Sequence, residues 1–557
     1  MHATKVFARC VVCGVIFLSG CGDSDAPTAA KKPSVLAPPS AKSQANGNLA
    51  DDAAPLAVGE SPGTNAQVSP APPLGPSPEP PPATPKKPAR ADEHLFVDWP
   101  APLAAIVITG EQLGYLEPCG CAGLENQKGG LARRYTLIKQ LREKQWPVVA
   151  VDLGGLIHRF GQQAEMKFQI AAEALKLMDY AAIGLGPEDL RLPAGVLAAS
   201  VASTDGGPSR FVDANVGLFA VDSGLTSRWR IVEAGGKKIG ITAVLADDLQ
   251  KEVGNGEVVM TAAEAALAEI APKLEAESDF RVLLSFADPK ESARLAKLFD
   301  VFHVVATAHG AEEPPAEPLR IEETPSEMVE VGHKGMFAVV IGVYDDRERP
   351  IRYQRVPIDS RFSDAPEMVT LRRNYQQQLE TLVTSGGWDA IGAKARPFPG
   401  ANAPDDPAGK FVGSKACADC HTKAYAIWAE TPHAHATETL VKLDPPRQFD
   451  PECVSCHATG WNPQEFYPYT HGYVGVQQTP QLMGNGCENC HGPGGAHVAA
   501  EQKDSPLADR IDALRAGLRL TLTTAREKTC AKCHDLDNSP EFDFTTYWPQ
   551  VEHKGKD

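Results

Sequence analysis

The sequence predicts an α/β domain followed by a mainly α-helical, turn-rich domain, and three observations lead to this expectation. The chain has 557 residues, which is too long for one ordinary core. Between residues 96 and 357, short apolar segments alternate with segments of helical spacing, a pattern typical of a largely buried sheet covered by helices. After about residue 409, cysteine and histidine become dense and strand periodicity is absent.

The expected elements of the α/β domain start with a strand at residues 104–109, a β-branched run that leads into a glycine-rich loop. Further strands are expected at residues 148–153, 181–185, 212–216, 238–245, 280–285, 302–306 and 336–344. Helices are expected at residues 131–144, 166–178, 262–276 and 289–299, and a polar helix at 368–383. We place the α/β domain at 98–360, a helical linker at 361–408 and the second domain at 409–557.

The N-terminus carries an export signal. Lys5 and Arg9 precede an apolar run at residues 11–18, which is too short to span a bilayer and therefore indicates a signal peptide. The run ends in Leu-Ser-Gly-Cys at residues 18–21, which resembles the lipobox of bacterial lipoproteins. That resemblance implies a signal peptide at 1–21 and acylation of Cys21, on the periplasmic side of a bacterial membrane; the alternative is an ordinary cleaved signal.

Residues 22–97 consist mainly of Pro, Ala, Ser and Gly, and almost no large apolar side chains interrupt them. Such a composition cannot bury a core, so we expect a disordered tether. The formal net charge of −17 argues against binding to nucleic acid or to anionic membranes through charge.

Four pentapeptides carry the chemistry of the second domain: CADCH at 417–421, CVSCH at 453–457, CENCH at 487–491 and CAKCH at 530–534. In Cys-x-x-Cys-His the two thiols add to a haem and the histidine becomes the proximal iron ligand. One copy could be a zinc knuckle or a redox dithiol, but four copies that use every cysteine of the region predict four covalently bound haem c groups. The attachment residues are Cys417, Cys420, Cys453, Cys456, Cys487, Cys490, Cys530 and Cys533, and the proximal ligands are His421, His457, His491 and His534.

A six-coordinate iron needs a second axial ligand. The candidates in this region are His433, His435, His471, His497 and His553, and up to four of the five could ligate iron.

Two segments resemble the tetrahaem cytochrome family of bacterial ammonia oxidation, whose members accept electrons from hydroxylamine oxidoreductase. They are residues 413–440, with Trp428 and Thr-Pro-His-Ala at 431–434, and residues 484–494, followed by His497. The resemblance covers about residues 410–557 and implies distal ligation by His433, His497 and, through the segment 548–553, His553. It also implies that the second haem is five-coordinate, which leaves the iron beside His457 open unless the additional His471 closes it.

The opening of the α/β domain resembles the 5′-nucleotidase-like metallophosphoesterases. Residues 106–133 contain a strand, the loop Gly-Glu-Gln-Leu-Gly at 110–114 and Gly-Gly-Leu-Ala-Arg at 129–133. This resemblance implies an α/β sandwich. However, Glu111 replaces the metal-binding aspartate of that family and Leu113 replaces its histidine.

The other expected metal ligands of that family are also altered. Gly155 stands where a bridging carboxylate is expected, Pro187 and Glu188 replace an amide and an imidazole, and Phe286 replaces a histidine, although His309 is retained. Two-metal phosphoryl chemistry needs a full ligand set. We therefore expect no ordinary phosphoesterase activity, and Glu111, Glu188, Asp189 and His309 are candidates for one weakly bound additional metal.

Cys119 and Cys121 lie in the loop after the first strand, where α/β folds place their sites. The pair could bind a soft metal, form a redox disulfide or form a structural disulfide.

The leading interpretation is a lipid-anchored multihaem cytochrome that passes electrons between a donor and an acceptor redox protein. One alternative is an oxidoreductase that acts on a small nitrogen or sulfur compound at the open haem or at Cys119 and Cys121. Another alternative is a phosphoesterase regulated by the redox state of the haem domain.

Overall fold

The computed structural model describes residues 94–118, 127–203, 206–403, 405–535, 538–539 and 542–555. All of them lie within one compact unit, Lys86–Asp557. The predicted signal peptide with Cys21, most of the predicted tether, and the pair Cys119 and Cys121 lie outside the described residues. Among the residues that are described, no helix combines the length and the apolar character needed to cross a membrane.

The first sheet has five strands in the order β13-β12-β1-β2-β3. Its strands are β1 (Ala104–Thr109), β2 (Val148–Asp152), β3 (Tyr180–Ile183), β12 (Phe337–Val343) and β13 (Ile351–Pro357). Strands β1, β2 and β3 run parallel, whereas β12 pairs antiparallel with β1 and β13. All residues of β1 and β12 are buried, as expected for strands covered on both faces.

The second sheet has six strands in the order β10-β11-β9-β8-β6-β5. They are β5 (Trp229–Ala234), β6 (Lys237–Leu245), β8 (Phe280–Phe286), β9 (Val304–Thr307), β10 (Leu319–Arg320) and β11 (Glu327–Glu330). Strands β4 (Val216–Leu218) and β7 (Val258–Met260) form a separate two-stranded pair.

The two sheets enclose a common core, which confirms the predicted α/β sandwich. On β8, Val282 and Leu284 belong to the core that also contains Ile106 and Val151 of the first sheet. Leu283, between them, belongs to the opposite face and packs with α6 (Ala263–Glu277) and α7 (Pro289–Leu298). This alternation follows from the two-residue period of a strand.

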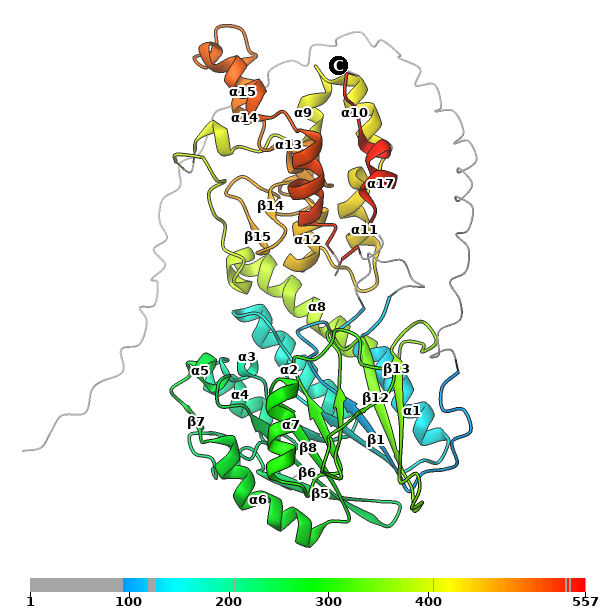
Figure 1. Cartoon of the computed structure of the whole chain (residues 1–557). Helices are drawn as coiled ribbons and strands as arrows, with labels where there is room; N and C mark the ends of the chain where they lie inside the picture. The colour runs from blue at the N-terminus through cyan, green and yellow to red at the C-terminus, as the bar shows by residue number, and fades with distance from the viewer. Residues whose placement is uncertain are drawn as a thin grey trace, which may run out of the picture. The chain divides into compact units, whose positions relative to one another are not determined.

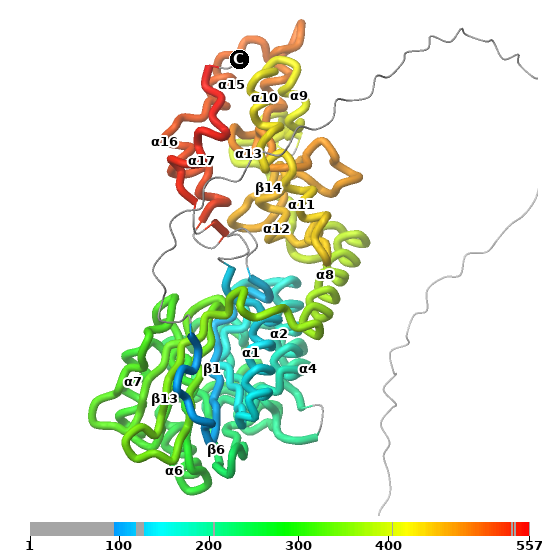
Figure 2. Tube along the Cα trace, turned by 90° about the vertical axis from the view of Figure 1, so that its right-hand side faces the viewer, coloured from blue at the N-terminus to red at the C-terminus, as the bar shows by residue number. Residues whose placement is uncertain are grey.

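Helices cover the outer faces (Figure 1). They are α1 (Leu131–Glu143), α2 (Gln162–Leu177), α3 (Pro187–Leu190), α4 (Ala194–Val201) and α5 (Gln250–Val253), besides α6 and α7. The predicted linker helix is α8 (Pro366–Gly386), and it packs on α1 and α2 through buried residues such as Leu371 and Leu379. Figure 2 follows the chain from α8 into the C-terminal region.

The sequence prediction was wrong about a strand over residues 212–216: Val212 forms an isolated bridge with Ser227, and strand β4 begins only at Val216. The side chain of Asn215 takes the place of a ladder there: it donates to the Leu245 and Thr261 carbonyls and accepts from the Leu245 N–H. The strands β5, β7, β10, β11 and β13 were not predicted, and three of them, β5, β10 and β13, lie at a sheet edge. Edge strands are half exposed, so they lack a continuous apolar run.

The C-terminal region consists of short helices and turns with one small hairpin, β14 (Trp461–Asn462) and β15 (Tyr467–Pro468). Its helices are α9 (Ser414–Ala418), α10 (Thr422–Ala429), α11 (Ala436–Lys442), α12 (Pro451–His457), α13 (Cys487–His491), α14 (Gly495–Ala500), α15 (Ile511–Gly517), α16 (Leu522–Thr524) and α17 (Phe544–Val551). Shorter helical turns lie at Pro432–His435, Ala525–Thr529 and Cys530–Lys532. Helices α10, α15, α16 and α17 have no buried residue, which suits a region whose core is completed by a bound group.

Candidate functional site

Each Cys-x-x-Cys-His pentapeptide forms a helical turn. In the first pentapeptide the backbone N–H of His421 donates to the Cys417 carbonyl, and in the last the backbone N–H of His534 donates to the Cys530 carbonyl, each over 2.8 Å. One such turn presents both thiols and the imidazole to the same side, which is the arrangement that haem attachment requires. Within the described residues, none of the eight cysteines of the four pentapeptides forms a disulfide.

Six of the predicted ligand histidines form three ring pairs. The ring centroids lie 6.5 Å apart for His421 and His497, 5.8 Å for His491 and His553, and 6.0 Å for His433 and His534. With metal–imidazole distances of about 2 Å, two rings on one metal have centroids roughly 6 Å apart. The pairs therefore fit an iron between each of three proximal histidines, His421, His491 and His534, and one distal histidine.

Hydrogen bonds at Nδ1 orient several of these rings. Nδ1 of His457, His491 and His553 donates to the carbonyls of Ala436, Leu518 and Val551 over 2.9, 2.8 and 2.9 Å. Nδ1 of His534 lies 2.9 Å from the Ser539 hydroxyl. A proton held on Nδ1 leaves the lone pair on Nε2, the atom that would face an iron.

His457 lies outside the three ring pairs, although its Nδ1 is held by a backbone carbonyl in the same way as Nδ1 of His491. Two further candidates, His435 and His471, also lie outside the pairs. His435 is largely exposed and has Glu438 3.8 Å away, whereas His471 is half-buried in the turn after β15. The second pentapeptide thus differs from the other three, in each of which the proximal histidine faces the ring of a distal histidine.

Contacts between thiols place the four pentapeptides in a row. Cys417 lies close enough to Cys487 for this contact to raise the pKa of Cys417 and lower that of Cys487, and Cys456 in the same way raises the pKa of Cys533. Cys490 and Cys530 interact electrostatically, and burial followed by this neighbour raises the pKa of Cys490 to about 12. The order in space is therefore first, third, fourth and second.

Glu488, inside the third pentapeptide, is a structural residue that the sequence analysis missed. Its buried carboxylate accepts the N–H groups of Val412, Gly413 and Gly494, with shortest distances of 3.0, 2.7 and 2.7 Å. Asn489 accepts from the Gly460 N–H and donates to the Ala458 carbonyl. These side chains join the third pentapeptide to the segment just before the first pentapeptide and to the segment just after the second.

In the α/β region, Phe286 fills the space at which the altered metal ligands converge. Its ring is buried, and ring atoms lie 3.2 and 2.8 Å from the positions that a Cβ would take on Gly155 and Gly186. It also packs edge-on against the His309 ring, with centroids 5.5 Å apart. A side chain at position 155 would be tightly packed against this ring, which would have to shift slightly to accept it.

Two aspartates near this position are used in the scaffold. Asp189 accepts four backbone N–H groups, from Gly155, Leu156, Ile157 and Gly186. Asp152 accepts from the Thr109 hydroxyl at 2.5 Å and the Gly154 N–H at 3.0 Å, and it lies 3.5 Å from Arg134. These hydrogen bonds occupy the oxygens that a metal would need.

Glu111 is the main ionisable group left at this edge of the sheet. Its carboxylate accepts from the His309 N–H and lies 4.0 Å from Nε2 of His309 and 3.8 Å from Nε2 of His333. Burial raises the pKa of Glu111 to about 7, the His309 hydrogen bond lowers it, and the charge of Glu188 raises it. Within the described ranges, no three His, Cys, Asp or Glu side chains form a group that could hold a metal.

The backbone of this edge is in an unusual conformation for its residue types. Glu111, Leu113 and His309 have φ angles of 44°, 53° and 53°. Left-handed conformations at residues other than glycine are uncommon and cluster at sites that shape a ligand pocket. The loops thus keep a site-like geometry although Phe286 fills its centre.

Comparisons with known proteins match both regions. A family model described as cytochrome c554 and c-prime matches residues 416–492. The cytochrome c-554 of Nitrosomonas europaea is 31% identical over 169 residues, which are 26% of this chain and 68% of that protein.

Among solved structures, a 5′-nucleotidase precursor from Thermus thermophilus is 18% identical with a TM-score of 0.43, and the match covers 50% of this chain and 59% of that one. A NAD nucleotidase from Haemophilus influenzae is 14% identical with a TM-score of 0.42, covering 68% and 74%. This chain thus spans less than two thirds of the 5′-nucleotidase, and these distant likenesses carry no statement about activity.

The cytochrome relative is matched over most of its length, and the matched family model spans the first three pentapeptides. The three histidine pairs give the same region a geometry that fits covalently bound haem c. The chain belongs to the cytochrome c554 family, whose haem c groups serve electron transfer.

Proposed function

We propose that the protein is a multihaem electron carrier in which four haem c groups pass electrons one at a time between a donor and an acceptor redox protein. Covalently bound haem supplies one-electron redox chemistry at an iron whose axial ligands set its potential. The proximal ligands are His421, His457, His491 and His534, and the distal ligands are His497, His553 and His433.

The observation that carries this proposal is the set of three histidine ring pairs, with centroids 5.8–6.5 Å apart, on pentapeptides that lie in a row. A row of attachment sites in contact with one another suits transfer between neighbours. Glu488 and Asn489 support this role because they fix the third pentapeptide, which lies inside the row.

A second candidate function is favoured by one specific feature. His457 lies outside the ring pairs, which supports a second haem with an open iron position that a small nitrogen or sulfur compound could occupy. The protein would then be an oxidoreductase at that position. Ligation by His471 would instead make it a carrier alone. The role of Cys119 and Cys121 in such chemistry remains a prediction from the sequence.

For the α/β region we propose a non-hydrolytic role. Phe286 fills the space between Gly155, Gly186 and His309, and Asp152 and Asp189 are committed to hydrogen bonds. A redox-regulated phosphoesterase would need a metal site that these contacts do not favour.

We propose that the mature protein is held on the periplasmic side of a bacterial membrane by a lipid on Cys21, with residues 22–97 as a tether. The proposal rests on the lipobox-like residues 18–21 and on the export that haem attachment requires. Radiolabelled palmitate should be incorporated into the wild-type protein, and it should not be incorporated into Cys21→Ser.

The electron-carrier proposal is tested by the mass and the reactivity of the exported protein. The mass should exceed that of the processed polypeptide by four haem groups, and the dithionite-reduced protein should deliver four electrons to a soluble one-electron acceptor. Fewer than four haems, or haems that cannot be re-oxidised by the acceptor, would contradict it. Turnover of phosphate esters by the same preparation, with added Mn²⁺ or Zn²⁺, would revive the hydrolase alternative.

A further inference from the structure

Helix α12, which carries the second pentapeptide, contacts the α/β region and the linker helix α8. Asp450, the residue that caps its N-terminus, accepts from the Gln163 amide at 3.0 Å and from the Gln376 amide at 3.2 Å. Glu452 lies in the first turn of α12, and both of its carboxylate oxygens accept hydrogen bonds from the Lys167 ammonium over 2.7 Å. The first turn of α12 is therefore bound by side chains of α2 and α8.

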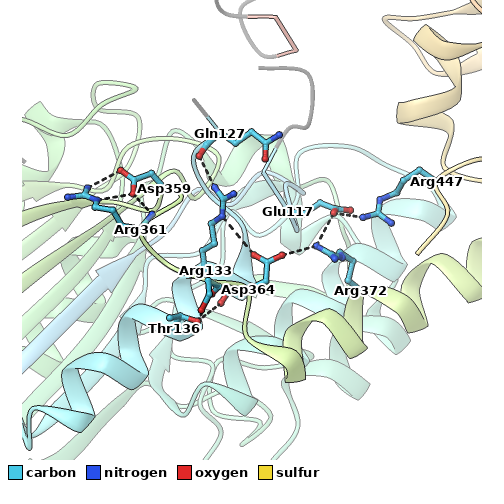
Figure 3. A network of polar contacts seen from close by, with 11 residues as sticks. Glu117, Gln127, Arg133, Thr136, Asp359, Arg361, Asp364, Arg372 and Arg447 are labelled. Carbon is cyan, nitrogen blue, oxygen red and sulfur yellow. Dashed lines mark hydrogen bonds and ion pairs between the residues drawn. The ribbon is translucent and has the colours of Figure 1, made fainter. Parts of the chain in front are cut away.

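A second ion pair joins the same two regions. Arg447, just before α12, donates to the Glu117 carboxylate over 2.6 Å, and Arg372 of α8 lies 3.3 Å from the same carboxylate. Figure 3 shows this contact and its continuation through Asp364 to Arg133. Glu117 belongs to the loop after β1, at the carboxyl end of the first sheet.

These contacts are partly shielded from water, because the cationic side chains are nearly buried while Glu452 and Glu117 are 32% and 29% exposed. The side chains of Lys167 and Arg447 are only 10% and 9% exposed. Val454 of α12 lies in the same apolar core as Tyr375 and Leu379 of α8, so the interface is continuous with the core of the sandwich. Charges in such a place act more strongly on one another than charges in water.

The charges act on the attachment cysteine of this pentapeptide. Burial, followed by the charges of Asp450 and Glu117, raises the pKa of the Cys453 thiol well above its usual range, and the charge of Arg447 lowers it. One of these acting groups, Glu117, comes from the α/β region. Lys167, from the same region, neutralises Glu452, which also raises the Cys453 pKa.

We infer that the α/β region completes the pocket of the second haem and that its residues Glu117 and Lys167 tune the reduction potential of that haem in opposite directions. The inference rests on the proposed function, since it requires haem at Cys453 and Cys456. A nearby negative charge stabilises ferric over ferrous iron and lowers the potential, and a nearby positive charge raises it. Both residues are tuning residues that act from outside the haem domain.

The test is a spectroscopic redox titration of the full, haem-loaded chain carrying Lys167→Met or Glu117→Gln. One of the four midpoint potentials should fall in Lys167→Met and rise in Glu117→Gln. For each variant we expect the ferric-to-ferrous ratio at fixed potential to change about tenfold, which corresponds to about 59 mV for one electron. The other three midpoints should move much less.

Lys139 and Glu367 supply the matched controls. They form a 2.7 Å ion pair between α1 and α8, with side chains 35% and 44% exposed. Lys139→Met and Glu367→Gln make the same chemical changes and should leave all four midpoints in place. The double variant Lys167→Met with Glu452→Gln removes both members of the buried pair and should return the shifted midpoint toward its original value.

Opposite shifts in the two variants would support the inference, because general loosening of the interface would move both in one direction. Four unchanged midpoints, or shifts of the same sign, would overturn it. If Lys167→Met fails to load haem, Glu117→Gln and Glu452→Gln should each still raise one midpoint, and the absence of that rise would overturn the inference. A wild-type protein with fewer than four haems would instead contradict the proposed function, so the two failures are distinguishable.

Discussion

The two regions of this molecule differ in what forms their cores. In the α/β region, strands such as β1 and β12 are buried at every residue, and side chains alone fill the sandwich. In the C-terminal region, whole helices such as α10 and α17 have no buried residue. The same region contains the cysteines and histidines of the four pentapeptides, where we propose that haem completes the core.

The contrast extends to the sites. The α/β region has a well-packed fold, and Phe286 packs closely against Gly155 and Gly186, where the sequence analysis expected altered metal ligands. The C-terminal region has little regular structure, yet its ligand geometry is intact in the three histidine pairs. A well-packed fold therefore does not need an intact site, and under the proposed function a haem site organises a region that would otherwise have almost no core.

The largest expected effect is the collapse of the C-terminal region when one haem cannot attach. Cys487→Ser combined with Cys490→Ser removes the third attachment site, which contacts the first and adjoins the fourth. Because the binding energy of such a group is also folding energy, we expect the region to become protease-sensitive while the α/β region stays resistant. Limited proteolysis with haem staining measures both.

The control for that experiment is Ser285→Ala with Ser292→Ala, which removes a 2.9 Å hydroxyl contact inside the α/β region. It should leave the haem count and the C-terminal fragment unchanged. A C-terminal region that remains protease-resistant with three haems would contradict the view that haem supplies its core.

The next effect is the conversion of one iron from low spin to high spin. His433→Ala removes the partner of His534 and should open that iron, as judged by the EPR spectrum of the oxidised protein. His435, in the same helical turn, is 61% exposed and lies outside the ring pairs, so His435→Ala is the matched control. Identical spectra for the two variants would show that His433 is not a ligand.

In the α/β region, Phe286→Ala should be costly without restoring chemistry. Truncation of a buried phenylalanine typically costs about 3–5 kcal/mol, and this ring is 3% exposed. Denaturant unfolding of the variant should show a loss of this size, whereas Leu298→Ala, at a side chain 48% exposed, should change little. Phosphate-ester turnover by Phe286→Ala with added Mn²⁺ would refute the view that the other ligands are also missing.

A smaller effect concerns the pH dependence of stability at Glu111. Its folded pKa of about 7 lies above its usual value of 4.5, so the folded state binds the proton more tightly than the unfolded state. Stability is therefore lost as the pH rises from about 4.5 to 7, by up to about 3 kcal/mol.

Glu111→Gln should remove this loss and make the α/β region more stable than wild type at pH 8 but not at pH 4. Unfolding by urea at both pH values measures the difference. The exposed Glu312→Gln, which lies in a nearby ion pair, should keep the wild-type pH dependence. An equal effect of Glu111→Gln at both pH values would argue against a raised pKa.

The sequence predicted the buried strands of the sandwich closely, because a strand covered on both faces is a continuous apolar run. Strand β1 matches the expectation residue for residue, and β6 and β12 differ from it by one residue at one or both ends. Edge strands such as β13, whose exposed residues include arginines, carry no such signal. The strand expected at 212–216 failed because Asn215 bonds through its side chain, which an apolar pattern does not reveal.

For the site, sequence spacing predicted the pentapeptides, but it could not predict which distal histidine meets which proximal one. His433 and His534 are about a hundred residues apart, and their pairing depends on the three-dimensional path of the chain. The sequence also could not predict that the segment around α12 forms ion pairs with Lys167 and Glu117. Lysine, arginine and glutamate form ion pairs both at the surface and in buried interfaces, so their presence does not indicate which kind a residue will form. The Glu at position 488, within the third pentapeptide, was the one local signal that could have been noticed.

The central claim is that haem organises the C-terminal region, with three irons closed by histidine pairs and the iron at His457 in a different state. EPR spectroscopy of the fully oxidised, full-length protein tests it most directly, with the haem count measured on the same sample. The account predicts four haems, three with low-spin bis-histidine signals and one with a high-spin signal. Four low-spin signals, or a high-spin signal that disappears in His534→Ala rather than in His457→Ala, would contradict it.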